Sequence, residues 1–339
     1  MISKVNLINF LLTLNIHLSE KFKYQLMNNT GSKAPGSISV ILAYLTVYIV
    51  WGSTYFFISK ALHGFPPFLL GGIRFVIAGL IMMLWAIWKK ENLLDWESIK
   101  LSAVTGFLIL FIGNGIVIFV EQYVGSAWVA IIIAAAPLWY VVYDKPHWKE
   151  NFESKSILTG LFLGLIGIFL LFLPNISSAY KTDRNPYERV AMFALIIGSM
   201  SWVIGSLYAK YKKTEAPASV NTGWQMFFAG IYFFIGAGFT GEFKTFQLSA
   251  VPMEAWYSIS YLVIFGSILA YSCFVWLIEV RSPAQVSTYA YVNPVVAVLL
   301  GVFLNAEHVN SLQIGGLFII LFSVLLVNLN KYIKRPRLA

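Results

Sequence analysis

The sequence predicts an all-α membrane protein in which ten transmembrane helices form two inverted five-helix repeats around a central cavity. Three observations lead to this fold class. First, 58% of the 339 residues are hydrophobic and only 12% are charged, with a mean hydropathy of +0.73, whereas soluble domains carry about 25% charged residues. Second, the apolar residues form stretches long enough to cross a bilayer. Third, landmarks of the first half recur in the second half.

Ten segments are apolar over the roughly 20 residues that a transmembrane helix needs. The predicted spans are 38–59, 66–88, 100–121, 125–143, 156–174, 190–209, 222–240, 254–278, 283–304 and 311–330. Short polar stretches separate them, and the longest of these joins the two halves. The predicted organisation is an N-terminal extension (1–37), a first repeat (38–174), a linker (175–189), a second repeat (190–330) and a basic tail (331–339).

The internal repeat is visible in pairs of identical residues at fixed spacing. Pro137 and Pro294 lie 157 positions apart, and Trp51 and Trp202 lie 151 apart. Each half holds five predicted spans, and an odd number makes the second copy enter the membrane from the opposite side. Inverted repeats with a site at their interface are typical of secondary transporters.

The basic residues predict the orientation. If the N-terminus is cytoplasmic, 18 of the 24 Lys and Arg residues fall on the inner side and 5 on the outer side, with Arg74 inside a span. Cytoplasmic loops are enriched in Lys and Arg, so we expect a multi-pass inner-membrane protein with both termini in the cytoplasm. Because the basic residues lie in short loops between spans, the formal charge of +9 does not indicate nucleic-acid binding.

The first 37 residues do not form an eleventh span. The segment from Leu7 to Leu18 is apolar but short, and polar residues interrupt it. We also find no clean signal peptide with a small-residue cleavage site. Two readings stay open: a disordered extension, or a mis-assigned start with translation beginning at Met27 instead of Met1.

Five motifs in a fixed order carry a family resemblance. They are Trp51-Gly52-Ser53-Thr54-Tyr55-Phe56, Gly72-Ile73-Arg74-Phe75, Gly113-Asn114-Gly115 with Glu121-Gln122, Pro137, and Tyr289-Ala290-Tyr291-Val292-Asn293-Pro294-Val295-Val296-Ala297-Val298. From about residue 38 to 330 the chain resembles the EamA-type transporters of the drug/metabolite transporter superfamily. The resemblance implies ten helices, cytoplasmic termini, a central cavity and export of small metabolites such as amino-acid-like compounds. The family's acidic residues after spans 4 and 9 match Glu150 and Glu307.

Two prolines lie near the middle of their spans. Pro137 is about 12 residues into span 4, and Pro294 about 11 residues into span 9, close to the midplane of a ~30 Å hydrocarbon core. A proline inside a helix frees the carbonyl four residues earlier, here those of Ile133 and Ala290. We interpret the pair as symmetric hinges beside the substrate, and the alternative is a static kink that improves packing.

Arg74 is the basic residue placed well inside a predicted span. Charges within the membrane usually line cavities or form pairs, and Glu121 ends span 3 on the same outer side. We expect the two to line or gate the outer half of the pathway, with a purely structural ion pair as the alternative. Gln225 occupies the place of Arg74 in the second half, so the charge is present on one side only.

Other polar and aromatic residues within spans complete the predicted cavity lining. Asn293 beside the second proline is the strongest candidate, because a buried amide is costly unless it is hydrogen-bonded. The remaining candidates for substrate binding are Trp51, Ser53, Thr54, Tyr55, Asn114, Trp202, Ser206, Tyr271, Tyr289 and Tyr291.

Other function classes find less support. The chain contains neither H-E-x-x-H nor G-x-S-x-G, and it lacks a Walker-type glycine loop, so we predict no enzymatic activity, cofactor or metal. The single Cys273 excludes an intrachain disulfide. Alternatives to metabolite export are multidrug efflux and a non-transporting scaffold. Gly160 and Gly164 form a small-xxx-small pattern that we assign to packing within the chain, which predicts a monomer or a weak homodimer with substrate and lipid as its partners.

Overall fold

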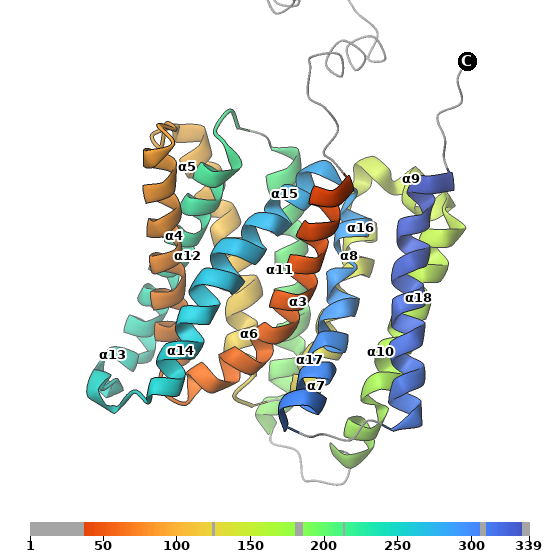
Figure 1. The fold of residues 1–339 in the computed structure, drawn as a ribbon. Coiled ribbons are helices and arrows are strands. Elements are labelled where there is room, and N and C mark those ends of the chain that lie inside the picture. The colour runs from red at the N-terminus through yellow and green to blue at the C-terminus, as the bar shows by residue number, and fades with distance from the viewer. Residues whose placement is uncertain (1–36, 124–125, 180–185, 213, 306–309, 334–339) are drawn as a thin grey trace, which may run out of the picture. The chain divides into compact units, whose positions relative to one another are not determined.

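The computed structural model describes residues 37–123, 126–179, 186–212, 214–305 and 310–333. Within these ranges the chain is helical and contains no strand, which confirms the all-α prediction (Figure 1). The predictions for residues 1–36 and for most of the basic tail lie outside the described residues. The bundle described below comprises the residues from Ile41 onward.

The helices of the first half are α3 (Ser37–Leu62), α4 (Pro67–Trp88), α5 (Trp96–Thr105), η1 (Gly106–Asn114), α6 (Gly115–Val120), α7 (Ser126–Ile133), α8 (Ala136–Tyr143), η2 (Lys145–His147), α9 (Trp148–Glu153) and α10 (Lys155–Ala179). Those of the second half are α11 (Pro186–Tyr211), α12 (Ala218–Thr240), α13 (Glu242–Thr245), η3 (Leu248–Ala250), α14 (Met253–Tyr261), η4 (Leu262–Tyr271), α15 (Ser272–Val280), α16 (Pro283–Val286), α17 (Tyr289–Asn305) and α18 (Ser311–Ile333).

Seven helical segments in the described part are long and apolar enough to cross a membrane. They are Ile38–Leu62, Pro67–Trp88, Trp96–Val120, Lys155–Leu173, Val190–Tyr211, Met253–Val280 and Ser311–Asn328. The other three predicted spans are occupied by α7 with α8, by α12, and by α16 with α17. In the two helix pairs the helix is interrupted, and the first segments are short: α7 has 8 residues and α16 has 4. Neither pair therefore contains a single described helix long enough to cross a membrane. Helix α12 has 23 residues, but it carries Asn221, Thr222 and Gln225 near its start.

Helix ends gather at two ends of the bundle. In Figure 1 the C-terminal ends of α4, α8, α11 and α15 lie at the same end as the C-terminal end of α18, which we call the tail end. The loops before α4 and α14 lie at the opposite end. Basic residues are frequent in the tail-end loops, which include Lys89, Lys90, Lys145, Lys212 and Arg281.

Glycines allow α4 of the first half to approach α12 of the second half closely. A Cβ atom added at Gly79 would lie 2.6 Å from the backbone nitrogen of Phe227, and one added at Gly230 would lie 2.6 Å from the backbone nitrogen of Val76. The two glycines are equivalent positions of the internal repeat. Their backbones therefore touch at a contact that no larger residue could occupy without a shift.

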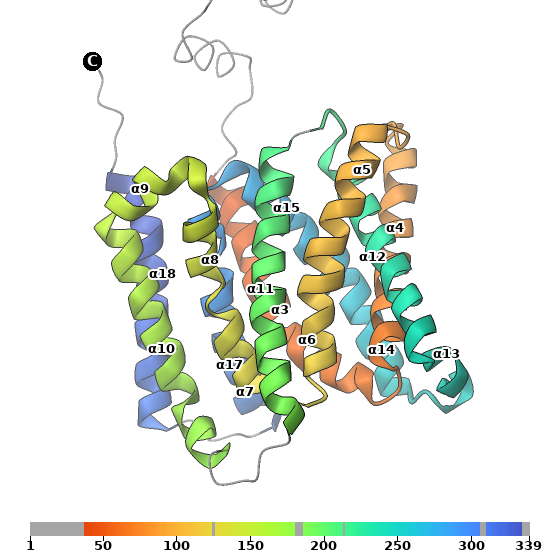
Figure 2. The same cartoon turned by 180° about the vertical axis from the view of Figure 1, so that it is seen from behind.

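Helices α10 and α18 form a second close pair, and they lie side by side in Figures 1 and 2. A Cβ atom at Gly160 of α10 would lie 3.0 Å from the backbone oxygen of Ser323 in α18. A Cβ at Gly164 would meet the ring of Tyr291 in α17 at 2.4 Å. The small-xxx-small pattern thus packs within the chain, as predicted.

Two π-helical segments were not predicted from the sequence. η1 occupies the middle of the third long helix, and η4 occupies the middle of the Met253–Val280 helix. They fall at equivalent places in the two repeats, about 156 positions apart. Short π-helical insertions are frequent at functional sites, and both segments border the cavity described next.

Candidate functional site

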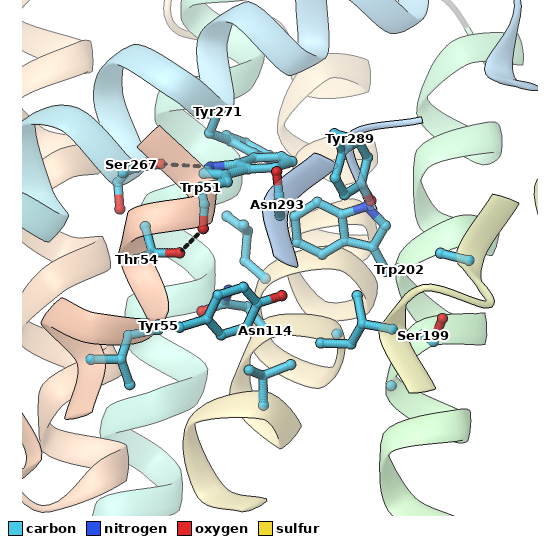
Figure 3. Close-up of a pocket in the computed structure, with 18 of the residues that line it drawn as sticks. Trp51, Thr54, Tyr55, Asn114, Ser199, Trp202, Ser267, Tyr271, Tyr289 and Asn293 are labelled. Atoms are coloured by element: carbon cyan, nitrogen blue, oxygen red, sulfur yellow. Dashed lines mark hydrogen bonds between the residues drawn. The ribbon is translucent and has the colours of Figure 1, made fainter. Parts of the chain in front are cut away.

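A cavity with a volume of about 90 Å³ lies in the middle of the bundle, between residues of both halves (Figure 3). Helices α3, α4, η1, α6, α7 and α8 line it from the first half, and α11, η4 and α17 from the second. Its lining residues are Trp51, Thr54, Tyr55, Ile58, Arg74, Phe75, Leu110, Gly113, Asn114, Val117, Ile133, Ala136, Gly198, Ser199, Trp202, Gly266, Ser267, Tyr271, Tyr289 and Asn293. Among the described residues, no group of three or more His, Cys, Asp or Glu could hold a metal ion.

Four aromatic rings line the cavity on the side of the tail end, those of Trp51, Trp202, Tyr271 and Tyr289, and the ring of Phe274 packs against them. The Trp51 ring centroid lies 5.4 Å from that of Trp202 and 5.0 Å from that of Tyr289, both in edge-to-face contact. Phe274 lies 5.1 Å from Trp51, and Tyr271 lies 6.4 Å from Trp202. Edge-to-face pairs at these separations stabilise a cluster beyond their buried area. We call these five residues the aromatic wall.

Arg74 is 3% exposed and reaches the cavity from α4. Its Nε donates a hydrogen bond of 2.8 Å to the hydroxyl of Ser267 in η4. Its guanidinium carbon lies 4.8 Å from the ring centroid of Phe75. The Nη1 nitrogen is buried and has no hydrogen-bond partner among the described residues. Arg74 therefore presents an unused donor within a largely apolar site.

Glu121 does not pair with Arg74 in the described part of the structure. Both of its carboxylate oxygens are buried without a hydrogen-bond partner, and it lies outside the cavity lining. The Nε of Arg74 turns instead to Ser267, a residue of the second half. Of the two acids that the family resemblance singles out, Glu150 is exposed in α9, and Glu307 falls outside the described residues.

Besides the indole Nε1 of Trp202, three further polar groups of the cavity lack hydrogen-bond partners among the described residues. The side-chain oxygens of Asn114 and Asn293 and the hydroxyl of Ser199 are buried with no hydrogen bond among the described residues. Most buried polar atoms in proteins are hydrogen-bonded, so each exception needs an explanation. All three residues line the same cavity (Figure 3). A polar ligand or water in the cavity would supply the missing partners.

Besides Glu121, three predicted binding residues lie outside the cavity lining. The Ser53 hydroxyl is 2.8 Å from that of Tyr261. Ser206 donates 2.7 Å to a carbonyl one turn earlier in α11. The Tyr291 hydroxyl donates 3.0 Å to the carbonyl of Leu161 in α10. The hydroxyls of Ser53 and Tyr291 therefore contact neighbouring helices, and the hydroxyl of Ser206 contacts its own helix.

The two prolines occupy different local structures. Pro137 lies at the start of α8, just after the interruption that follows Ile133. Ile133 lines the cavity. Pro294 lies inside α17 next to Asn293, and the helix continues through it. Their predicted role as paired hinges stays a prediction.

Sequence reasoning missed several residues of the site. Ser199 and Ser267 are short hydroxyl residues without a distinctive motif, although both line the cavity.

Gln225, the counterpart of Arg74, forms hydrogen bonds with both its amide oxygen and its amide nitrogen. It accepts a 2.9 Å bond from the Tyr271 hydroxyl and donates a 3.0 Å bond to Thr105. The amide is therefore satisfied within the protein.

Hydrogen bonds between the two halves tie the tail end of the bundle. The Tyr211 hydroxyl of α11 donates to the carboxylate of Asp144, which follows α8 and is 1% exposed. The Nδ1 of His147 lies 3.1 Å from the same carboxylate. The hydroxyls of Tyr48 and Thr288 are 2.7 Å apart. We call the Asp144–Tyr211 bond the tail-end latch.

Polar contacts between the halves also occur at the opposite end. Lys60 of α3 forms an ion pair of 2.8 Å with Glu254 of α14. The carboxylate of Glu242 accepts bonds of 3.2 and 2.8 Å from the backbone nitrogens of Phe68 and Leu69, in the first turn of α4. A carboxylate at a helix N-terminus satisfies amides that lack partners within the helix. The cavity thus lies between two sets of contacts.

Comparison with known proteins adds to this geometry. Residues 38–173 and 189–329 each match the model of the EamA-like transporter family. The chain is 33% identical over 294 residues to the uncharacterized inner membrane transporter YedA of Escherichia coli, covering 86% of this chain and 91% of YedA.

More distant relatives and one solved structure also match the chain. The chain is 23% identical over 293 residues to the uncharacterized transporter YvbV of Bacillus subtilis, covering 86% of this chain and 91% of YvbV. It is 28% identical over 287 residues to protein PecM of Dickeya dadantii, covering 82% and 88%. A solved crystal structure that is 17% identical matches 88% of this chain and 100% of its own chain with a TM-score of 0.71, which shows a shared fold.

Proposed function

Because the chain belongs to the EamA-like transporter family, we propose that it exports small polar metabolites across the inner membrane by alternating access. The observation that carries this proposal is the central cavity, which both halves line and in which several buried polar groups lack partners. Secondary transporters commonly bind their substrate near the midplane, at the interface of two repeats.

The proposed architecture has ten spans in two inverted repeats. Seven segments are long and apolar enough to cross a membrane, and α7 with α8, α12, and α16 with α17 would supply the other three. The close contacts of Gly79 and Gly230 support a symmetric relation between the halves. The basic residues in the tail-end loops support a cytoplasmic tail end.

In alternating access, the contacts between the halves at one end of the bundle would break while those at the other end remain. Opening toward the cytoplasm requires the aromatic wall to part and the tail-end latch to break. Opening to the outside requires the Lys60–Glu254 ion pair at the opposite end to separate. Each set ties the first half to the second, so rocking of the halves about the cavity would break one set while the other holds.

The chemistry of the cavity favours a polar cargo over a lipophilic one. Buried Arg74, Asn114 and Asn293 would each lose hydration without gaining a bond if a purely apolar compound filled the cavity. Unpaired buried polar groups discriminate strongly against ligands that lack the matching group. Multidrug efflux is therefore the weaker candidate.

Replacing Asn293 with alanine should reduce export of the cargo by about tenfold, because one hydrogen bond to the cargo contributes on the order of 1 kcal/mol and the lost amide also alters the cavity. The measurement is a metabolite comparison between cells that overexpress the wild-type protein and cells that overexpress Asn293→Ala at the same membrane level. A compound that accumulates outside only the wild-type cells identifies the cargo.

The matched control is Asn92→Ala, since Asn92 is an exposed loop asparagine remote from the cavity. Its export profile should equal that of the wild type. A set of exported compounds that are uniformly lipophilic would support drug efflux instead. Identical profiles for wild type, Asn293→Ala and cells without the protein would contradict transport by this cavity.

A further inference from the structure

Arg74 is a buried cation that no described acidic side chain neutralises. Its Nε donates a hydrogen bond to Ser267, whose hydroxyl is neutral, and its guanidinium lies over the uncharged ring of Phe75. The Nη1 nitrogen remains unpartnered although Arg74 is 3% exposed. Buried charges in proteins are usually paired, so an anionic group that entered the cavity would find a partner in Arg74.

Three described acidic residues at the end of the bundle opposite the tail end make no bond to Arg74. Glu242 accepts bonds from the first turn of α4, and Glu254 pairs with Lys60. Both carboxylate oxygens of Glu121 are without a hydrogen bond, so Glu121 does not bind Arg74. The lining of the cavity contains no Asp and no Glu. Among the described residues none neutralises Arg74, and an anionic ligand in the cavity would do so.

We infer that the cargo of this cavity is a compact organic anion whose negative group binds the guanidinium of Arg74, an inference that rests on the proposed transport function. Arginine presents its donors as a planar fork that matches a carboxylate. The bond from Nε to Ser267 fixes the orientation of the fork and leaves Nη1 for the ligand.

The second half of the cavity offers no matching charge. Gln225 stands where the repeat would place a second arginine, and its amide is satisfied by Tyr271 and Thr105. One cation and no acid give the empty cavity a single positive charge. A cargo with one negative charge and no positive charge neutralises it, whereas a zwitterion or an amine leaves a buried charge uncompensated.

The other lining residues and the volume of the cavity indicate the polarity and the size of the rest of the cargo. Asn114, Asn293 and Ser199 offer hydrogen bonds to hydroxyl or carbonyl groups, and the aromatic wall offers an apolar surface. The volume of about 90 Å³ is below the ~150 Å³ of a cavity that accepts benzene. The cargo class is thus a small carboxylate with few additional polar groups, and amino-acid-like zwitterions are disfavoured.

The test compares ligands that differ only in charge. Full-length protein in lipid nanodiscs is titrated calorimetrically with butyrate, 2-aminobutyrate, butylamine and 1-butanol, and with the smaller series propionate, alanine, propylamine and 1-propanol. In at least one series the anion should bind at least about tenfold more tightly than the other three compounds, because a charge-assisted bond to Arg74 forms only with the anion.

Variants of Arg74 connect this preference to the proposed contact. Arg74→Gln should abolish the preference for the anion, while Arg74→Lys, which keeps the charge, should retain part of it. Lys89→Gln removes an exposed cation from the end of the same helix and should bind like the wild type. Size-exclusion profiles establish that each variant is folded, and Arg74→Lys keeps the test valid if Arg74→Gln is unstable.

Several outcomes overturn the inference. They are tighter binding of the zwitterion or the amine, no binding of any anion, and an anion preference that survives Arg74→Gln. None of these outcomes contradicts transport itself, because the metabolite comparison with Asn293→Ala scores export without assuming the charge of the cargo. Identical export profiles for wild type, Asn293→Ala and cells without the protein, with anion binding intact, would instead contradict the proposed function alone.

Discussion

Replacing Gly230 with alanine is expected to destabilise the protein by about 1–3 kcal/mol, and replacing it with leucine should prevent formation of a monodisperse protein in detergent. A Cβ atom at Gly230 would lie 2.6 Å from the backbone nitrogen of Val76 and 3.1 Å from the backbone oxygen of Gly72. Because both neighbours are backbone atoms, no side-chain rotation can relieve the overlap. Helices α4 and α12 would have to separate, which weakens the contact between the two halves.

The measurement is the apparent Tm of purified protein, which we expect to fall by roughly 2–10 °C for the alanine variant. Gly238→Ala is the matched control, since it changes the same residue type on the same helix and its Cβ would meet nothing within 4 Å. This control should leave the Tm unchanged or raise it, because alanine is the better helix former. Equal shifts at positions 230 and 238 would refute the close packing of α4 on α12.

Replacing Tyr211 with phenylalanine is expected to open the tail end about tenfold more often than in the wild type. The substitution removes the hydroxyl that donates to the buried carboxylate of Asp144 and leaves the ring in place. A hydrogen bond to a charged group is worth about 1.5–3 kcal/mol, and we take the lower limit because Tyr211 is exposed in part. The substitution also removes the contact of the Tyr211 hydroxyl with Nδ1 of His147, which lies 3.0 Å away.

Opening can be measured by the labelling rate of a cysteine at Ser206, which is 1% exposed and lies between the aromatic wall and the latch on α11. In a Cys273→Ala background, a water-soluble maleimide should label Ser206→Cys about tenfold faster when Tyr211→Phe is also present. Tyr208→Phe provides the control, because Tyr208 is a partly exposed tyrosine of the same helix whose hydroxyl faces Lys212. Unchanged labelling with Tyr211→Phe would show that the latch does not hold the tail end closed.

The composition and the repeat predicted the helical fold and its two related halves. Apolar stretches separated by short basic loops require helices, because backbone groups in lipid must be hydrogen-bonded within their own segment. The π-helical segments η1 and η4 could not be predicted in this way. Their sequences are as apolar as those of ordinary spans, and the wider turn depends on how neighbouring helices pack.

The candidate site was predicted in part. Arg74, Asn114 and Asn293 drew attention because polar residues are costly in the middle of a span, and the structure places all three in the cavity lining. Ser53, Ser206 and Tyr291 are also polar residues within spans, but they bond to protein groups outside the cavity lining. A polar residue in a span must find a partner, and sequence alone does not distinguish a partner in the protein from a ligand.

The sequence by itself determined a membrane-embedded helical protein with a duplicated architecture and an intramembrane arginine that the second repeat replaces with Gln225. These properties follow from the hydrophobicity and charge of each residue and from its position in the chain, none of which depends on the folded structure. Only the tertiary structure decided that Arg74 turns to Ser267 and not to Glu121, and that Gln225 is satisfied while Nη1 of Arg74 is not. Partner choice depends on the rotation of each helix about its axis, and that rotation is fixed by packing between segments distant in the chain.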